Sequence, residues 1–206
     1  MRVKICGITN LADALAAADA GADALGFILY EKSKRFIQIE DAMKIVEKLP
    51  PFVQTVAVTV NARREFSNLG WRKQLKHFGL AQLHGQESPV HVHAVAKYLS
   101  VIKVLPADGA ANLNPDTFDV SAFLLDTPSP EHGGTGRTFD WALAAAFMKR
   151  TRKPVILSGG LTPENVARAI EAVHPYAVDV ASGVESAPGK KDHAKVRDFI
   201  QQCKKF

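Results

Sequence analysis

At residues 154–160 the sequence reads Pro-Val-Ile-Leu-Ser-Gly-Gly, and Leu-Thr-Pro-Glu-Asn follows at residues 161–165. The apolar run predicts a short β-strand. Thr162 and Pro163 suit the N-cap and first position of a helix that continues over residues 166–173. Glycines let a ligand approach the backbone closely, and a helix N-terminus offers free N–H groups. Taken alone, this strand–turn–helix unit fits an ordinary tight turn as well as a phosphate site.

The same pattern recurs outward from this stretch. Residues 177–183, Ala-Val-Asp-Val-Ala-Ser-Gly, again run from a strand into Ser-Gly. Strands are predicted at residues 3–6, 24–29, 55–60, 80–84, 101–105, 122–126, 154–157 and 177–181. Each is followed by a helix or a helix-sized segment, and the segment after the fifth strand, residues 107–120, is predicted to be irregular. Such alternation predicts parallel strands with right-handed crossovers.

The position of the glycines favours a closed barrel over an open sheet. An open doubly wound sheet usually has its glycine fingerprint after the first strand. Here the glycine-rich loops, at residues 133–136, 158–160 and 182–183, follow strands six, seven and eight. Phosphate sites of barrels lie commonly after strands seven and eight. We therefore expect residues 1–206 to form one α/β domain, a (β/α)8 TIM barrel with eight parallel strands.

Composition sets the broad class of protein. The chain has 206 residues, of which 47% are hydrophobic and 23% charged, enough for one core. No apolar run predicts a membrane span or a signal peptide, and two cysteines make no disulfide framework, so we expect a cytoplasmic protein. The net charge of +5 is spread along the chain. It indicates solvated faces or an anionic small-molecule ligand, and no nucleic-acid motif is present.

Polar residues interrupt strands that should be apolar, and they fall on one face of each strand. They are Lys4 and Cys6, Gln82 and His84, Asp126, and Asp179. If the apolar alternates face the helices, these side chains point into the barrel near its C-terminal mouth, where active sites of this fold lie. Burying them is costly unless they are paired or used.

Each of these residues also has an ordinary structural interpretation. Cys6 could be a small buried hydrophobe, although a cation such as Lys4 would favour its thiolate. Asp126 could bond loop N–H groups, and His84 could be structural. Gln82 could simply pack or form hydrogen bonds.

Two further charges are left open in the same way. Lys4 and Asp179 lie on strands one and eight, which become neighbours when the barrel closes, so they could form an interior ion pair. Arg35 is a solvated loop charge unless the ligand carries a carboxylate, which its planar fork suits.

An ordered set of motifs resembles a known family. They read Lys-Ile-Cys-Gly-Ile-Thr at 4–9, Gln-Leu-His-Gly at 82–85, Gly-Gly-Thr-Gly at 133–136, Phe-Asp-Trp at 139–141, Leu-Ser-Gly-Gly-Leu at 157–161 and Ser-Gly-Val-Glu at 182–185. Pro-Gly-Lys-Lys-Asp follows at 188–192. Together they resemble the phosphoribosylanthranilate isomerase family of tryptophan biosynthesis, over nearly the whole chain.

The resemblance implies a (β/α)8 barrel enzyme. Its reaction is the Amadori rearrangement of N-(5-phosphoribosyl)anthranilate to 1-(2-carboxyphenylamino)-1-deoxyribulose 5-phosphate, without a metal or organic cofactor. The partner would be this phosphosugar, with no nucleic acid or membrane, and the protein would be a monomer or homodimer.

The resemblance also implies roles for individual residues. Cys6 would be the general base that takes the proton from ribose C2, and Asp126 the general acid that protonates the ring oxygen. Arg35, His84 and Asp179 would bind substrate, with Arg35 on the anthranilate carboxylate. The phosphate would be bound by five loop residues: Gly134, Gly159, Gly160, Ser182 and Gly183.

Some positions depart from the family pattern, and rival interpretations remain. Thr59 stands where an aromatic residue is common, Ala181 where a serine is usual, and Lys34 where proline is common. The nearest rival is the histidine-pathway aldosylamine isomerase, which would use aspartates as acid and base and show a half-barrel repeat. A noncatalytic phosphate-ligand sensor would need neither Cys6 nor Asp126. A basic interaction domain would not need the glycine loops.

Overall fold

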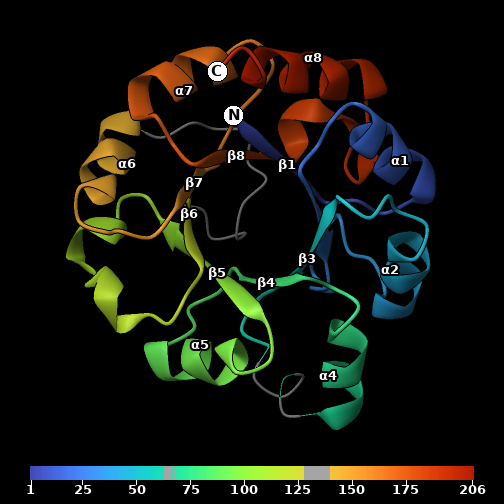
Figure 1. Cartoon of the computed structure of the whole chain (residues 1–206), viewed down its shortest axis with the longest axis horizontal. Coiled ribbons are helices and arrows are strands. Elements are labelled where there is room, and N and C mark those ends of the chain that lie inside the picture. Colours follow the sequence, from blue (N-terminus) through green and yellow to red (C-terminus); the bar gives the residue numbers. More distant parts are fainter. Residues whose placement is uncertain (63–65, 67, 128–139) are drawn as a thin grey trace.

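The eight predicted strands form a closed parallel barrel (Figure 1). The structure is a computed structural model that describes every residue except 63–65, 67 and 128–139. The strands are β1 (Arg2–Cys6), β2 (Ala24–Ile28), β3 (Gln54–Thr59), β4 (Leu80–Leu83), β5 (Ser100–Pro106), β6 (Ala122–Asp126), β7 (Val155–Leu157) and β8 (Ala177–Val180). Each strand pairs with the next, and β8 pairs with β1, with Lys4 beside Asp179. The barrel is confirmed, and the open doubly wound sheet is wrong.

Helices surround the barrel, as Figure 1 shows. Those described are α1 (Leu11–Asp19), α2 (Ile39–Val46), α4 (Leu69–Leu75), α5 (Pro89–Ala96), α6 (Trp141–Met148), α7 (Val166–Val173) and α8 (His193–Cys203). In the part of the chain that the structure describes, no helix combines the length and apolar character needed to cross a membrane.

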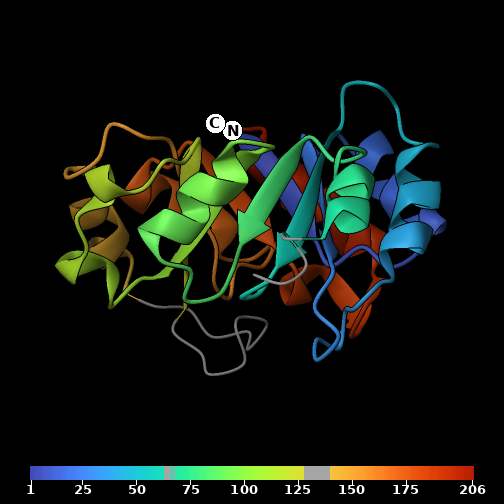
Figure 2. The same ribbon diagram turned by 90° about the horizontal axis from the view of Figure 1, so that it is seen from below.

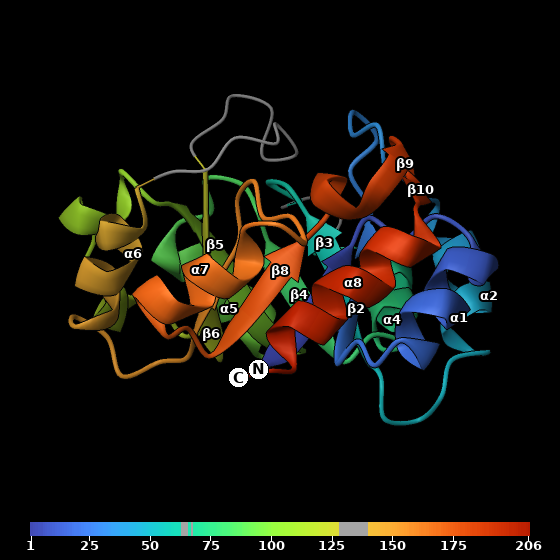
Figure 3. The same cartoon turned by 90° about the horizontal axis from the view of Figure 1, so that it is seen from above.

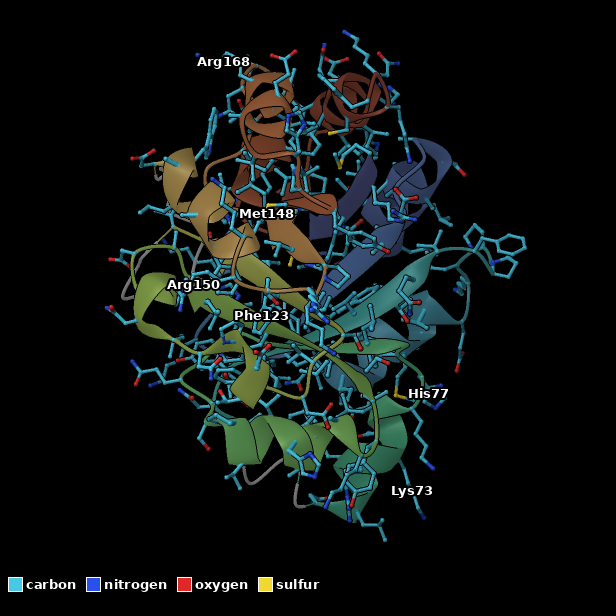
Figure 4. All side chains as sticks on the ribbon, turned by 60° about the vertical axis from the view of Figure 1, so that its left-hand side comes forward. Lys73, His77, Phe123, Met148, Arg150 and Arg168 are labelled. Carbon is cyan, nitrogen blue, oxygen red and sulfur yellow. The ribbon has the colours of Figure 1, made fainter. Side chains whose placement is uncertain are left out.

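The segment after β5 is irregular, as expected. It contains two short 3₁₀ turns, Ala110–Asn112 and Pro115–Thr117. Arg150, labelled in Figure 4, donates to the carbonyl oxygens of Ala110 and Leu113 and so ties this segment to the end of α6.

Local sequence signals begin most of the helices. The side chains of Asn10, Ser88, Asp140 and Asp192 each accept a hydrogen bond from a backbone N–H in the first turn of the following helix. The predicted helix over residues 166–173 is confirmed as α7, but its predicted N-cap and first position are wrong. Thr162 is not the N-cap, since the helix begins at Val166. The side chain of Asn165 instead accepts from Thr162 N–H and donates to Gly160 O, which shapes the turn.

Apolar side chains form two layers, separated by the barrel wall. Alternate strand residues, among them Val58, Val104 and Leu124, fill the interior together with Cys6. Their neighbours, such as Ile5, Leu25 and Phe123, face the helices. Phe123, labelled in Figure 4, packs edge to face against Phe118 and Phe147. The predicted inward face of the strands is therefore confirmed.

The two ends of the barrel differ in what they carry. Figures 2 and 3 show the chain termini side by side at one end. At the opposite end, where the strands finish, a hairpin of β9 (Glu185–Ala187) and β10 (Lys190–Lys191) projects beyond β8. The sequence predicted only a loop for residues 182–191, because strands of three and two residues leave almost no periodicity to detect.

Candidate active site

The first strand ends in a buried thiol. Cys6 is the last residue of β1, and Lys4 precedes it on the same inward face. A Cβ added to Gly26 of β2 would lie 2.8 Å from Cys6 Sγ and 3.0 Å from Lys4 Nζ. The neighbouring strand therefore needs a glycine there to leave room for both groups. We did not select Gly26 from the sequence, although a glycine inside a strand can signal such a close approach.

Lys4 and Asp179 form the interior ion pair that their strands made possible. Lys4 Nζ donates to Asp179 Oδ1 at 2.8 Å, and both side chains are buried. Ser158 Oγ donates to the other carboxylate oxygen at 3.2 Å. Burial lowers the pKa of Lys4, but Asp179 and Cys6 outweigh it and raise that pKa to about 12. Lys4 is therefore a cation whose counterion is already in place.

The expectation that Cys6 favours its thiolate is wrong. Burial raises the pKa of the Cys6 thiol. Lys4 acts in the opposite direction, but Asp179 adds to the increase, and the net shift is upward. The cation that the sequence placed beside the thiol is largely neutralised by Asp179. Cys6 is therefore a thiol at neutral pH.

Asp126 ends β6 and is held by its neighbours. Thr127 N–H donates to Asp126 Oδ1 at 2.7 Å, so the loop bond expected from the sequence is present. His84 Nε2 lies 3.3 Å from Asp126 Oδ2, and Gln82 Nε2 lies 3.4 Å from His84 Nδ1. Because an amide NH₂ only donates, Nδ1 accepts and Nε2 carries the hydrogen that points at Asp126. Gln82 therefore orients His84, and His84 orients the carboxylate.

Two glycine turns face the same space. Gly159 and Gly160 both have positive φ, at 87° and 64°. Within the described ranges, the N–H groups of these two residues have no hydrogen-bond partner. A Cβ on Gly183 would lie only 1.9 Å from Leu161 O, so the loops after β7 and β8 pack directly on each other. The two unpaired N–H groups of the turn after β7, beside the Ser-Gly loop after β8, suit an anion.

Arg35 reaches the mouth of the barrel, but it is not simply solvated. Its guanidinium makes a bidentate pair with Glu185 on β9, and Glu185 also accepts from the buried Lys191 on β10. We did not select Glu185 or Lys191 from the sequence. The motifs at residues 182–185 and 188–192 contain them, and they are opposite charges on either side of the Pro188-Gly189 turn.

The predicted site residues converge on one pocket at the C-terminal mouth of the barrel. The structure places the following side by side in its lining: Cys6, Arg35, His84, Asp126, Gly159, Gly160, Asp179, Ser182 and Gly183. Gly134 lies outside the described residues. The same lining also includes the aromatic Tyr30 and the apolar Ile28, Val58 and Val60. In the described part of the chain, no cluster of His, Cys, Asp or Glu could hold a metal ion.

Sequence comparisons agree with this architecture. Residues 3–202 match the family model described as N-(5'-phosphoribosyl)anthranilate isomerase. A protein of that name from Geobacter metallireducens is 51% identical over 206 residues, covering 99% of both chains. Another from Pelobacter propionicus is 50% identical over 206 residues, covering 99% of this chain and 96% of its own.

Solved structures of similar proteins have the same fold. The phosphoribosyl anthranilate isomerase of Thermotoga maritima is 47% identical, with a TM-score of 0.89 over the whole of both chains. A second, 44% identical with a TM-score of 0.86 over both whole chains, is in complex with reduced 1-(o-carboxyphenylamino)-1-deoxyribulose 5-phosphate. A third, described as monomers of the dimeric Thermotoga maritima enzyme, is 42% identical with a TM-score of 0.84 over both whole chains.

Proposed function

The chain belongs to the N-(5'-phosphoribosyl)anthranilate isomerase family, and from this we propose that it catalyses the Amadori rearrangement of N-(5-phosphoribosyl)anthranilate in tryptophan biosynthesis. The product is 1-(2-carboxyphenylamino)-1-deoxyribulose 5-phosphate. One observation supports this most: a thiol on β1 and a carboxylate on β6 line the same pocket as two glycine turns. An aldosylamine-to-ketosamine shift needs an acid and a base at different atoms of one phosphorylated sugar.

Asp126 is the general acid in this proposal. Its proton passes to the furanose ring oxygen, the C1–O bond breaks, and the nitrogen lone pair forms the iminium. The contacts from Thr127 N–H and His84 support this role because they fix the carboxyl group at the end of β6. A positioned proton-transfer group contributes about 10²–10⁴-fold to the rate.

Cys6 is the general base. It takes the proton from C2 of the iminium to give the enolamine, which then tautomerises to the ketone. The base must first lose its own proton, and burial raises the pKa of that thiol. Lys4 supports the role because its cation favours the thiolate once the proton has left.

The substrate spans the pocket between two kinds of wall. The phosphate binds at Gly159, Gly160, Ser182 and Gly183, and we retain Gly134 in this set. The carboxylate of the anthranilate binds Arg35, and the aromatic ring lies against apolar side chains of β2 and β3, which are Ile28, Val58 and their neighbours. The reduced product analogue bound by a similar protein carries the same phosphate and carboxylate.

The remaining proposals concern the whole protein. Residues 1–206 act as one domain, in the cytoplasm, without a metal or organic cofactor. His84 and Asp179 support substrate binding through Asp126 and Lys4. The chain functions as a monomer or a homodimer. One similar protein is dimeric, and light scattering measures which of the two states this chain adopts.

Turnover tests the activity. Phosphoribosylanthranilate is generated in situ, and the loss of its fluorescence is followed with purified protein. We expect turnover by the wild type, and at least ~10²-fold lower kcat for Cys6→Ala and for Asp126→Asn. Folded wild-type protein that binds the substrate without turning it over would instead support the sensor interpretation. Variants with near-normal kcat would contradict the acid and base roles.

A further inference from the structure

A buried lysine anchors the mouth of the barrel beside Cys6. The Lys191 side chain is fully buried, with 0% exposed. Its Nζ donates to Cys6 O at 2.6 Å, Ala181 O at 3.1 Å and Glu185 Oε1 at 3.0 Å. The three ammonium hydrogens are thus all used. Lys191 therefore joins the ends of β1 and β8 and fixes where the Glu185 carboxylate stands.

Glu185 in turn fixes one edge of Arg35. Arg35 Nε donates to Glu185 Oε1 at 2.8 Å, and Arg35 Nη2 donates to Oε2 at 2.7 Å. Gly189 N–H donates to Oε1 at 3.2 Å. The arginine stem crosses Gly7 so closely that an added Cβ there would lie 2.7 Å from Arg35 Cδ. The guanidinium is therefore held along its stem and along one edge.

The other edge of the guanidinium is free to bind. Arginine has five N–H groups, and the contact with Glu185 uses the Nε–Nη2 edge. Among the described residues, Nη1 has no hydrogen-bond partner. Arg35 lines the pocket, so the Nη1–Nη2 edge is available for a second carboxylate in a bidentate pair.

The summed charge of Arg35, Glu185 and Lys191 also suits the binding of one more anion. Burial raises the pKa of Glu185, but Arg35 and Lys191 outweigh it and hold that pKa below its usual value. Glu185 is therefore ionised at neutral pH. Burial lowers the pKa of Lys191 in spite of Glu185, but the three hydrogen bonds that its Nζ donates are those of an ammonium group. Two cations and one carboxylate then leave a net charge of +1, which one ligand carboxylate would balance. The group is preformed rather than assembled on binding.

The geometry points to Glu185 and Lys191 as positioning residues. They hold Arg35 so that its Nη1–Nη2 edge binds the carboxylate of an aromatic amine substrate. This rests on the proposed function, in which Arg35 binds the anthranilate carboxylate. It goes further, because it makes discrimination for that carboxylate depend on the orientation of Arg35 as well as on its charge.

A pair of ligands isolates this effect. One is reduced 1-(o-carboxyphenylamino)-1-deoxyribulose 5-phosphate, and the other is the same compound without its carboxylate. Isothermal titration calorimetry gives the ratio of their dissociation constants for each variant. Losses that affect the whole pocket, such as a disturbed phosphate loop, weaken both ligands and cancel in the ratio.

The key variant is the double substitution Glu185→Gln with Lys191→Met. It removes one carboxylate and one cation, so the net charge of the group stays at +1 while the support for Arg35 is lost. We expect the preference for the carboxylated ligand to fall roughly 10-fold or more, the scale of hydrogen bonds to charged groups. An unchanged ratio in the folded double variant would overturn the proposal, because charge alone would then suffice.

Controls keep the test decisive. Glu171→Gln, an exposed glutamate on α7, should leave the ratio at the wild-type value. If the double variant does not fold, Glu185→Gln alone is measured. Its net charge of +2 would by itself favour the carboxylated ligand, so a fall in the ratio supports the positioning role, and an unchanged or higher ratio contradicts it. A wild type with no preference for the carboxylate would also overturn the inference. The proposed function has its own criterion, turnover of phosphoribosylanthranilate, so the two failures are distinct.

Discussion

Cys6 shows how one residue's protonation depends on a partner of its neighbour. Lys4 lies next to the thiol on β1, and a lysine in that position favours a thiolate. Asp179, which comes from the far end of the chain, pairs with Lys4 at 2.8 Å. Its negative charge offsets most of the effect by which the Lys4 cation lowers the pKa of Cys6. Burial then decides the outcome, and the pKa of Cys6 rises.

The pH dependence of catalysis follows from this. Because the thiol pKa is raised, the base form grows as pH increases, so kcat/KM should rise through the neutral and alkaline range. Lys4→Met removes the cation and leaves Asp179 unpaired. Both changes raise the pKa of Cys6 further. We expect the rising limb to move to higher pH, with a loss of kcat/KM at neutral pH within ~10²-fold.

A matched variant separates this effect from general damage. Lys48→Met removes an exposed lysine on the outer surface and should leave the pH profile unchanged. A limb that stays in place, or moves to lower pH, in folded Lys4→Met would contradict the assignment of that limb to Cys6.

At the scale of elements, the turn between β7 and α7 has little freedom to change. Gly159 has φ +87°, and a Cβ there would lie 2.4 Å from Thr127 Oγ1 and 3.1 Å from Asp126 Oδ1. The turn is therefore packed against the end of β6. Its glycine is required both by its backbone angle and by the carboxylate beside it.

Gly159→Ala should therefore affect catalysis as well as stability. The left-handed angle costs about 1–2 kcal/mol in stability. Displacing Asp126 by a fraction of an ångström to 1 Å should lower kcat/KM by up to ~10²-fold. Steady-state kinetics and thermal melting measure the two effects. Gly21→Ala has the same kind of strain at φ +97°, with its nearest neighbour at 3.8 Å, and should lose stability but not activity.

A second element-scale feature lies on the outer face of the barrel. Lys103 on β5 and Glu87 after β4 form a buried ion pair at 2.9 Å. Lys103 also donates to Leu83 O and Gly85 O, while Glu87 accepts from Asn61 N–H and Gly85 N–H. Burial raises the pKa of Glu87, but Lys103 and the Asn61 N–H outweigh it, so that pKa lies below its usual value. Burial also lowers the pKa of Lys103, and Glu87 opposes this change and favours the lysine cation. The pair organises the chain on both sides of His84.

Removing one partner of this pair should be costly. Glu87→Gln leaves the Lys103 cation buried without a counterion, for which we expect a loss of about 3–5 kcal/mol in the free energy of unfolding. Urea denaturation measures it. Lys44→Met removes an ion pair that is exposed on α2 and should cause no measurable change. Equal stability of the two variants would show that the buried pair does not hold these loops.

At the scale of the whole molecule, the first and last units close the barrel together. Strand β1 pairs with β8, and the termini lie side by side in Figure 3. Asp13 on α1 accepts from Lys191 N–H at 2.8 Å and contacts His193 Nε2 at 2.8 Å. Burial raises the pKa of Asp13, but these groups and Asn10 outweigh it, and the net shift is downward.

Asp13→Asn tests this closure. A carboxylate with a lowered pKa stabilises the fold above its unfolded pKa of about 4, and the effect is lost as pH falls through its folded pKa. We expect the variant to lose roughly 1–3 kcal/mol at neutral pH, the cost of poorly satisfied buried donors. The difference in unfolding free energy between wild type and variant should then become smaller at acid pH.

Melting temperatures at a series of pH values measure this gap. Asp19→Asn, exposed on the same helix, should follow the wild type at every pH. A gap that does not narrow in acid would contradict the role assigned to the Asp13 charge.

Most of the fold could be predicted from the sequence because its signals are local. Apolar runs, N-caps such as Asp140, and strand-ending glycines each act within a few residues. The errors are also local. The N-cap of α7 was assigned to Thr162 instead of Asn165, since both residues lie in the same turn and both are common cap residues. The β9–β10 hairpin was missed because its strands are too short to show a period.

The sequence by itself determined the eight-fold alternation, the inward position of Lys4, Cys6 and Asp126, and the family. These follow from periodicity and from motifs that remain recognisable without neighbours. Only the tertiary structure decided which charged groups pair with one another. Asp179 forms an ion pair with Lys4, and Glu185 forms ion pairs with Arg35 and Lys191. The physical reason is that electrostatic and desolvation energies depend on distance and burial in space, and barrel closure brings together residues more than 100 positions apart in the chain.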